Sequence, residues 1–131
     1  MTHREAACSC GQLRVEVQGD PVRVSMCHCL ACQRRTGSVF GVQSRYPASA
    51  VRIAGEATEY VRTADSGKRI RFSFCPLCGS TVYYRFEGND DIVAIPVGAF
   101  ADPAFPRPAF SVWEDRQHAW VNVPEGAERM R

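Results

Sequence analysis

The chain has 131 residues, 45% of them hydrophobic and 23% charged, with a formal net charge of +2. This length fits one domain over residues 1–131 with a modest core, and no stretch approaches the roughly 18 continuous apolar residues of a membrane-spanning helix. The first residues also lack the apolar run of a secretory signal, so the reducing cytoplasm is the expected location.

Hydrophobic and polar residues alternate along much of the chain, which is the period of half-buried strands. Residues 13–17 and 22–26 alternate in this way around the turn Gly19-Asp20-Pro21, and they predict a hairpin. Residues 30–36 favour a short helix that ends at Gly37. Further strands are expected at residues 39–46, 51–53, 58–62, 69–74, 80–86, 92–97, 110–113 and 119–123. The sequence therefore predicts a mainly β fold with short helical turns, arranged as a single compact sheet structure.

Seven cysteines fall into three tight groups, and this grouping is the most informative feature of the sequence. The groups are Cys8 with Cys10, then Cys27 with Cys29 and Cys32, then Cys75 with Cys78. Such spacings allow sulfurs to lie about 3.8 Å apart, the edge of a tetrahedron with Zn–S bonds of about 2.3 Å. Disulfides fit poorly, because such short loops strain the bridge and an odd count leaves one thiol unpaired. The pattern therefore predicts metal binding.

Seven cysteines divide naturally into four plus three. A structural zinc site is closed by four protein ligands, whereas a catalytic site has three and leaves one position to water or substrate. We assign the two short pairs, Cys8/Cys10 and Cys75/Cys78, to a closed structural zinc, and the triplet to a second zinc with an open position. Two other interpretations of the triplet remain. Either His28, His118 or an acidic side chain completes a structural site, or the three cysteines are free core residues.

Metal binding changes what the net charge implies about partners. Seven thiolates and two zinc ions would convert the formal charge of +2 to about −1. The arginines are dispersed along the sequence and form no basic tract. Nucleic acid is therefore not an expected partner.

Two stretches of the sequence, together with the cysteine pattern, resemble the glutathione-dependent formaldehyde-activating family. The run Cys27–Ser38, which reads CHCLACQRRTGS, resembles the central motif of that family. The stretch Val97–Pro103, with Pro108, Trp113 and Trp120 after it, is similar to the family's C-terminal half. All seven cysteines match the family pattern, and the resemblance extends from Cys8 to about Val121.

This resemblance implies a β-tent fold of the Mss4-like group that holds two zinc ions per chain. It implies a structural zinc at Cys8, Cys10, Cys75 and Cys78 and a catalytic zinc at Cys27, Cys29 and Cys32. It also implies a carbon–sulfur lyase. The named reaction is the reversible joining of glutathione and formaldehyde to S-hydroxymethylglutathione, and the family includes members with other roles, so the substrate is carried over less safely than the fold.

A zinc ion with three thiolate ligands should be a weak Lewis acid, because the thiolates donate much charge. A soft ligand suits it, and the thiol of glutathione is such a ligand. One hypothesis is that this thiol enters the open position and attacks formaldehyde or a related carbonyl. In the alternative, zinc polarises the carbonyl oxygen and the thiol is not bound to the metal. Arg34 and Arg35 are candidate partners for the glutathione carboxylates, and exposure to solvent explains each arginine equally well.

His28 is a candidate proton donor or acceptor, because a free histidine titrates near neutral pH. A histidine beside metal ligands more often packs behind them, and we favour that role. We expect the aromatic residues Phe100, Phe105, Trp113 and Trp120 to lie in the core. The competing hypothesis for the whole chain is a non-catalytic zinc module, with both metals structural, whose surface binds another protein.

Overall fold

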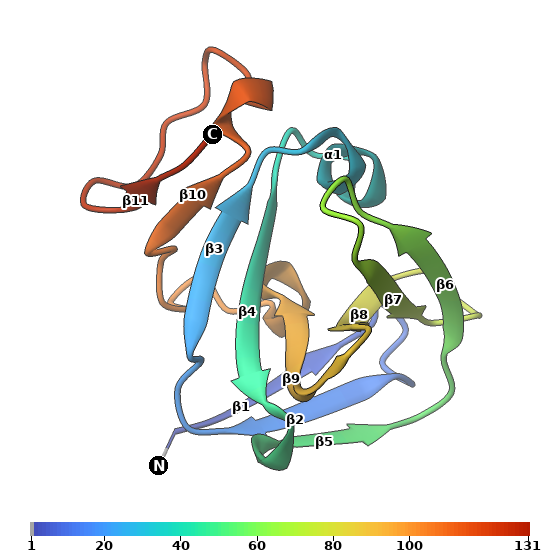
Figure 1. The fold of residues 1–131 in the computed structure, drawn as a ribbon. Helices are drawn as coiled ribbons and strands as arrows, with labels where there is room; N and C mark the ends of the chain where they lie inside the picture. The colour runs from blue at the N-terminus through green and yellow to red at the C-terminus, as the bar shows by residue number, and fades with distance from the viewer. Residues whose placement is uncertain (1) are drawn as a thin grey trace.

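The computed structural model describes residues 2–131 and confirms a mainly β fold (Figure 1). The strands form two sheets. The smaller sheet has the order β1 (His3–Ala7), β2 (Arg14–Gln18), β5 (Val51–Ala54). The larger sheet has the order β11 (Glu128–Arg129), β10 (Phe110–Val112), β3 (Arg23–Cys27), β4 (Gly41–Pro47), β9 (Asn89–Pro96), β8 (Thr81–Phe86), β7 (Arg69–Phe74), β6 (Thr58–Thr63).

Helical structure is limited to short segments, as the sequence predicts. The α-helix is α1 (Leu30–Thr36), and three 3-10 turns follow, η1 (Ala48–Ala50), η2 (Val97–Phe100) and η3 (Glu114–Arg116). Gly37 ends α1 in the left-handed conformation with φ 72°, and its N–H donates to the Gln33 carbonyl at 2.9 Å. Within residues 2–131, no helix has the length and apolar character needed to cross a membrane.

The predicted hairpin of residues 13–17 and 22–26 is wrong, although both segments are strands. β2 pairs with β1 and β5 in the smaller sheet, whereas β3 pairs with β4 and β10 in the larger one. Figure 1 shows β1 and β2 running across the lower ends of β3 and β4. Alternation shows that a strand has one buried face, but it does not identify the neighbouring strand. The fold is therefore built of two sheets and not of one.

One further expectation about strands is corrected, and two strands, β1 and β11, were not predicted. Residues 119–123 form no strand, and the very short β11 pairs with β10 at the edge of the larger sheet. β1 carries the polar start His3-Arg4-Glu5, which hides its strand character in the sequence. The remaining predicted strands lie close to the observed ones, including those on either side of Cys75 and Cys78.

The main core lies between the two sheets. Its buried members are Ala6, Cys8, Leu13, Val15, Val17, Val24, Tyr46, Cys75, Val82, Val93, Ile95, Phe100 and Phe105. Side chains alternate across a strand, so β4 directs Val42 and Tyr46 to this core and presents Gln43 and Arg45 on the opposite face. The larger sheet thus has one face against the smaller sheet and one free to form a site.

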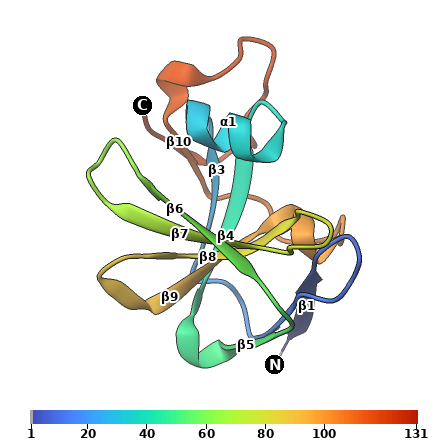
Figure 2. The ribbon, with the colours of Figure 1, turned by 90° about the vertical axis from the view of Figure 1, so that its right-hand side faces the viewer.

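The opposite face of the larger sheet carries a second, smaller core of Ile70, Phe72, Tyr84 and Ala94. A bulge lies beside it in β8, where Ser73 pairs with Tyr83 and Phe74 pairs with Thr81, so that Val82 has no direct partner. Val82 therefore packs in the main core while Tyr84 packs in the second one. Figure 2 shows the β6–β7 and β8–β9 pairs extending from the side of the molecule below α1.

Candidate metal centres and the adjoining cleft

The structure brings Cys8, Cys10, Cys75 and Cys78 together, with all four sulfurs within 4.8 Å of one another. The Sγ atoms of Cys8 and Cys10 are 3.6 Å apart, and those of Cys10 and Cys75 are 3.7 Å apart. These separations match the edge of about 3.8 Å that follows from Zn–S bonds of about 2.3 Å. All seven cysteines of the chain are free thiols. The four-cysteine cluster can therefore hold a tetrahedral metal ion.

Two tight loops at strand ends position these four sulfurs. Cys8 follows β1, and its loop closes with Gly11 N–H donating to the Cys8 carbonyl at 3.0 Å. Cys75 follows β7, and Gly79 N–H donates to its carbonyl at 2.8 Å. The Oγ atoms of Ser9 and Ser80 lie 2.9 Å apart and join the two loops. The cluster thus ties the smaller sheet to the larger one.

N–H groups of the protein support the sulfurs as thiolates. Gln12 Nε2 donates to Cys75 Sγ at 3.0 Å, and Leu13 N–H donates to Cys8 Sγ at 3.3 Å. Backbone N–H groups of Ser80 and Cys10 lower the pKa of Cys78 to about 5. Hydrogen bonds to the charged form favour deprotonation, and thiolate is the form that binds metal.

The second cluster brings Cys27, Cys29 and Cys32 together within the same distance limit. Cys27 is the last residue of β3, Cys29 is the N-cap of α1, and Cys32 lies in the first turn of the helix. The Cys29 side chain accepts a hydrogen bond from Cys32 N–H at 3.3 Å, so a ligand sulfur also caps the helix. Cys27 and Cys32 are buried, and Cys29 is half-buried.

The three sulfurs share protons unequally. Hydrogen bonds from Cys27 and Cys32 hold the pKa of Cys29 far below its usual range. Hydrogen bonds with Cys29 and Cys32, together with burial, raise the pKa of Cys27. A bound cation removes this conflict, because it stabilises all three thiolates together. Soft sulfur ligands in this number suit zinc.

In the described part of the chain, no fourth histidine, cysteine or carboxylate ligand atom joins the triplet. His118, a candidate from the sequence, instead bonds through Nε2 to Gln33 Oε1 at 3.0 Å. The Gln33 amide nitrogen donates to the carbonyls of His28 and Arg116 at 2.9 and 3.2 Å. Gln33 therefore fastens α1 to the loop that follows β10 without closing the metal position.

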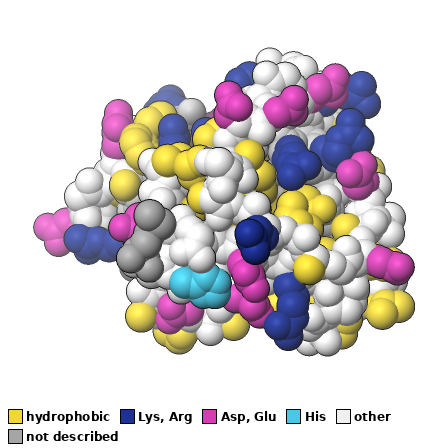
Figure 3. Space-filling model, turned by 90° about the horizontal axis from the view of Figure 1, so that it is seen from below, with side chains coloured by type: hydrophobic (Ala, Val, Ile, Leu, Met, Phe, Trp, Pro, Cys, Tyr) yellow, Lys and Arg dark blue, Asp and Glu magenta, His cyan; other side chains and the backbone are white. Residues whose placement is uncertain are grey.

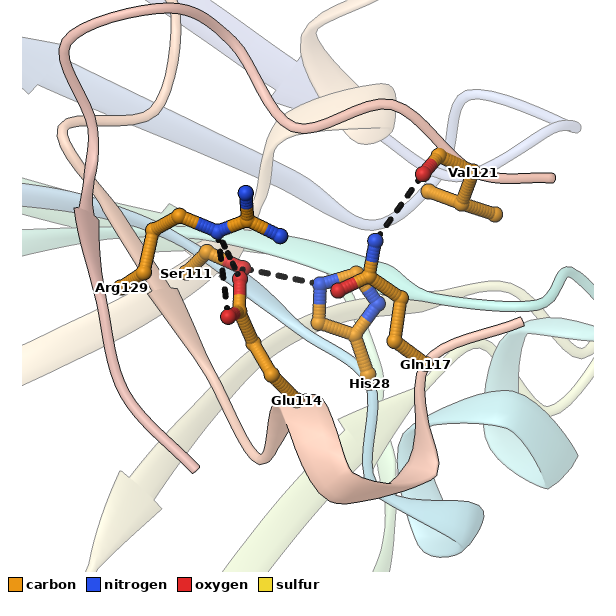
Figure 4. A network of polar contacts seen from close by, with 6 residues as sticks. All are labelled: His28, Ser111, Glu114, Gln117, Val121 and Arg129. Carbon is orange, nitrogen blue, oxygen red and sulfur yellow. Dashed lines mark hydrogen bonds and ion pairs between the residues drawn. The ribbon is translucent and has the colours of Figure 1, made fainter. Parts of the chain in front are cut away.

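His28 lies between two of these cysteines but is fully buried. Its Nε2 is 2.9 Å from Ser111 Oγ, and Ser111 donates to Glu114 Oε2 at 2.6 Å (Figure 4). Arg129 Nε in turn donates to both Glu114 oxygens, at 3.1 and 2.9 Å. Because Ser111 donates to Glu114, it accepts from His28 Nε2–H. Burial lowers the pKa of His28, so the ring is neutral at neutral pH. These contacts favour the packing role over proton transfer.

A cleft with a volume of about 540 Å³ opens from the triplet across the free face of the larger sheet. Cys27, Cys29 and Cys32 line one part of it. Its floor includes the second core, with Ile70, Phe72 and Tyr84. Its basic lining residues are Arg23, Arg35, Arg45, Arg62, Lys68 and Arg116, and Asp65 is the acidic one. The cleft therefore has a strong excess of positive charge, which favours anionic ligands.

The two arginines predicted to contact glutathione lie in different places. Arg35 lines the cleft, with its guanidinium carbon 5.3 and 5.6 Å from the ring centres of Tyr84 and Phe72. Arg34 is exposed and is not among the residues that line the cleft. The geometry therefore supports Arg35 as a candidate contact and gives no such support to Arg34.

Nothing in the sequence singles out the other four arginines of the cleft, which are Arg23, Arg45, Arg62 and Arg116. Arg23 and Arg45 occupy the polar positions of alternating strands, which the sequence alone assigns to solvent. The charges are arranged differently on another face of the molecule. On the face of the molecule seen from below, acidic and basic side chains are interspersed (Figure 3).

The expectation that four aromatic residues are core is half right. Phe100 and Phe105 are buried and stacked, with ring centres 4.7 Å apart. Trp120 is 70% exposed, and Trp113 is 38% exposed and lines the cleft. Trp113 also has φ 56°, a left-handed conformation that is unusual for a bulky residue. It follows Val112, which pairs with Cys27, so the strained residue adjoins the triplet.

Comparison with known proteins agrees with these features. No curated protein sequence matches the chain. A crystal structure of a Rhodobacter sphaeroides protein is similar in fold, with a TM-score of 0.58 and 19% identity over 97% of this chain and 99% of that one. The family model described as glutathione-dependent formaldehyde-activating enzyme matches residues 3–116. The chain therefore belongs to the glutathione-dependent formaldehyde-activating family.

Proposed function

We propose that the protein is a zinc-dependent carbon–sulfur lyase that acts on an adduct of glutathione or a similar thiol, in the manner of an S-hydroxymethylglutathione synthase. The observation that carries this proposal is the contrast between a four-sulfur cluster closed by protein and a three-sulfur cluster that opens into a cationic cleft. Catalytic zinc sites are of the open kind. Family membership supports the same class of reaction.

Cys27, Cys29 and Cys32 would hold the reactive zinc, and Cys8, Cys10, Cys75 and Cys78 the structural one. Bound at the triplet, a zinc ion would supply the positive charge that favours the thiolate form of an incoming thiol. Arg62 and Arg35 add positive charge near Cys29 and Cys32. The side chains of Leu30, Val112 and Trp113 provide an apolar part of the lining.

The cleft would position the two reactants for addition. Arg35 would bind a carboxylate of the thiol, since a guanidinium holds a carboxylate with two parallel hydrogen bonds. This contact would keep the sulfur near the carbonyl carbon and lower the entropic part of the barrier. In the reverse direction the same contacts would hold the adduct while the carbon–sulfur bond breaks.

Exchange NMR tests this function directly on an equilibrium mixture of glutathione and formaldehyde. Exchange between free glutathione and S-hydroxymethylglutathione should accelerate in proportion to the concentration of the wild-type protein. Cys29→Ser should remove the acceleration, and Arg107→Gln, at an exposed position outside the cleft, should retain it. Exchange at the uncatalysed rate with fully zinc-loaded protein would reject the named reaction.

X-ray absorption spectroscopy on the same samples distinguishes an enzyme from a non-catalytic binding module. An open metal position predicts that X-ray absorption at the zinc edge changes when glutathione is added, because a fourth sulfur replaces a lighter ligand. A module with both metals closed predicts an unchanged spectrum.

A further inference from the structure

Arg23 and Arg45 form a pair of like charges on the floor of the cleft, away from the cysteine triplet. They lie directly opposite each other on the antiparallel strands β3 and β4, and both line the cleft. Side chains at directly opposed positions are in contact range, and like charges there repel each other. Burial and the charge of Arg23 lower the pKa of Arg45, which reflects this repulsion.

No carboxylate of residues 2–131 compensates either charge. The ion pairs of this part of the chain involve other basic residues, among them Arg4, Arg14, Arg69 and Arg71. The Nε atoms of both Arg23 and Arg45 are buried and have no hydrogen-bond partner. Buried donors are nearly always paired, so two orphaned donors at one place indicate a missing acceptor.

The two guanidinium groups are held in place without using their N–H groups. The Arg23 guanidinium carbon lies 4.1 Å from the ring centre of Phe110, and that of Arg45 lies 4.9 Å from the ring centre of Phe86. Such stacking fixes the planar group and leaves its edge free to donate. The pair is therefore prearranged for an external oxyanion.

The metal cluster does not account for this pair of arginines. Arg62 and Arg35 are the residues whose positive charge acts on Cys29 and Cys32. Arg23 lies four residues before Cys27 on the same face of β3, which is about 13 Å along the strand. Ser25 and Gln43 form the next cross-strand pair toward the triplet, with Gln43 Nε2 3.4 Å from Ser25 Oγ. A polar floor thus connects the two arginines to the sulfurs.

We propose that Arg23 and Arg45 together form a second anion-binding subsite, which takes a carboxylate of the thiol substrate while the sulfur lies at the triplet. This proposal rests on the function proposed above. It specifies the substrate class as thiols that carry a carboxylate several bonds from the sulfur. An extended tripeptide spans about 10 Å from end to end, and the thiol of glutathione is on its central residue, so the long arginine side chains must cover part of the distance. Small uncharged thiols lack the group that this subsite recognises.

Calorimetric titration with S-methylglutathione, at fixed ionic strength, tests the subsite without catalysis. This probe keeps both carboxylates of glutathione but has no thiol. Wild-type protein should bind it, and both Arg23→Gln and Arg45→Gln should weaken binding at least tenfold. Arg107→Gln, which changes an exposed arginine outside the cleft, is the matched control and should leave binding unchanged.

Thermal unfolding of the same variants provides a second readout that a merely structural role would not give. Removing one of two repelling charges should leave the Tm of the ligand-free protein unchanged or raise it, while binding is lost. A loss of binding that accompanies a lower Tm in both variants would mean that the arginines only maintain the fold, which overturns the proposal. Equal binding of the probe by wild type and variants, or no binding by wild type, would overturn it as well.

Inorganic phosphate distinguishes the source of the oxyanion. If phosphate binds in an Arg45-dependent manner and S-methylglutathione does not compete with it, the carboxylate assignment is wrong. The diethyl ester of glutathione, which keeps the thiol and lacks both carboxylates, should bind equally to wild type and Arg45→Gln. If binding depends on the arginines but exchange is not accelerated, the subsite is retained and the lyase function is rejected. If exchange is accelerated but binding does not depend on the arginines, the lyase function is retained and the subsite is rejected.

Discussion

The two cysteine clusters use the same type of ligand but differ in how far apart their ligands lie in the sequence. The four-sulfur cluster joins loops that are far apart in sequence, since Cys10 and Cys75 are separated by 65 positions, and it connects the two sheets. The three-sulfur cluster is contained within six consecutive residues at the junction of β3 and α1. The first cluster therefore closes long loops of the fold, whereas the second organises only its immediate surroundings. This difference predicts unequal consequences when each is disrupted.

The largest effect is expected from Cys75→Ser. Cys75 is fully buried and completes the four-sulfur cluster. Binding of a structural zinc contributes about 10 kcal/mol or more, which is comparable to the whole stability of a typical domain. The variant should be insoluble or lack the β-sheet signal in far-UV circular dichroism. Cys29→Ser, prepared in parallel, should keep that signal, and equal collapse of both variants would remove the distinction between the clusters.

Cys29 variants separate the role of the triplet in binding metal from its role in capping the helix. Cys29→Ser should reduce zinc from about two ions per chain to about one, measured by elemental analysis, while serine still caps α1. Cys29→Ala loses the cap as well, and it should be less stable than Cys29→Ser by about 1 kcal/mol in urea unfolding. Identical stability of the two variants would contradict the capping role.

Removal of metal by a chelator should proceed in two stages. The triplet contributes three ligands and the other cluster four, so the ion at the triplet should be released first. The second ion should leave only with loss of β structure. A colorimetric zinc indicator monitors release of the ions, and circular dichroism recorded over the same period monitors the β structure. Release of both ions in a single step would indicate that the clusters are equivalent.

A smaller effect is expected from two glutamines, one beside each cluster. Gln12 donates to Cys75 Sγ and to the Glu56 carbonyl and accepts from Glu56 N–H. Gln12→Ala should cost about 1–3 kcal/mol in urea unfolding, because these groups lose partners near the junction of the sheets. Gln33→Ala should cost less, because local opening of α1 needs little energy, but it should speed zinc release from the triplet. A larger loss of stability for Gln33→Ala than for Gln12→Ala would contradict the view that the four-sulfur cluster matters more for the stability of the fold.

Local features of this fold could be predicted from the sequence, and long-range pairing could not. Residue spacing is enough to group the cysteines, to place α1 between Leu30 and Thr36, and to locate the strands around Cys75. The neighbours of β2 depend on contacts with β1 and with β5, and the latter is more than thirty residues away. Alternation within β2 carries no information about that partner.

The cleft was missed for a related physical reason. The polar positions of β3 and β4 hold Arg23, Gln43 and Arg45, and a polar face is normally assigned to solvent. The larger sheet brings residues of β6, β7 and β8, among them Arg62, Phe72 and Tyr84, to the same face, so that it lines a cleft. Trp113 was misassigned to the core in the same way, because an aromatic residue carries no signal in sequence for the wall of a site.

The start of α1 at Cys29 has a consequence for cooperativity between ligands. The helix has seven residues, too few to be stable alone, and it carries Arg35 into the cleft. An ion that immobilises Cys29 and Cys32 therefore also sets the position from which the Arg35 guanidinium meets an anion. Linkage makes this coupling reciprocal, so that an anion bound by Arg35 must increase the affinity of the triplet for its ion by the same factor.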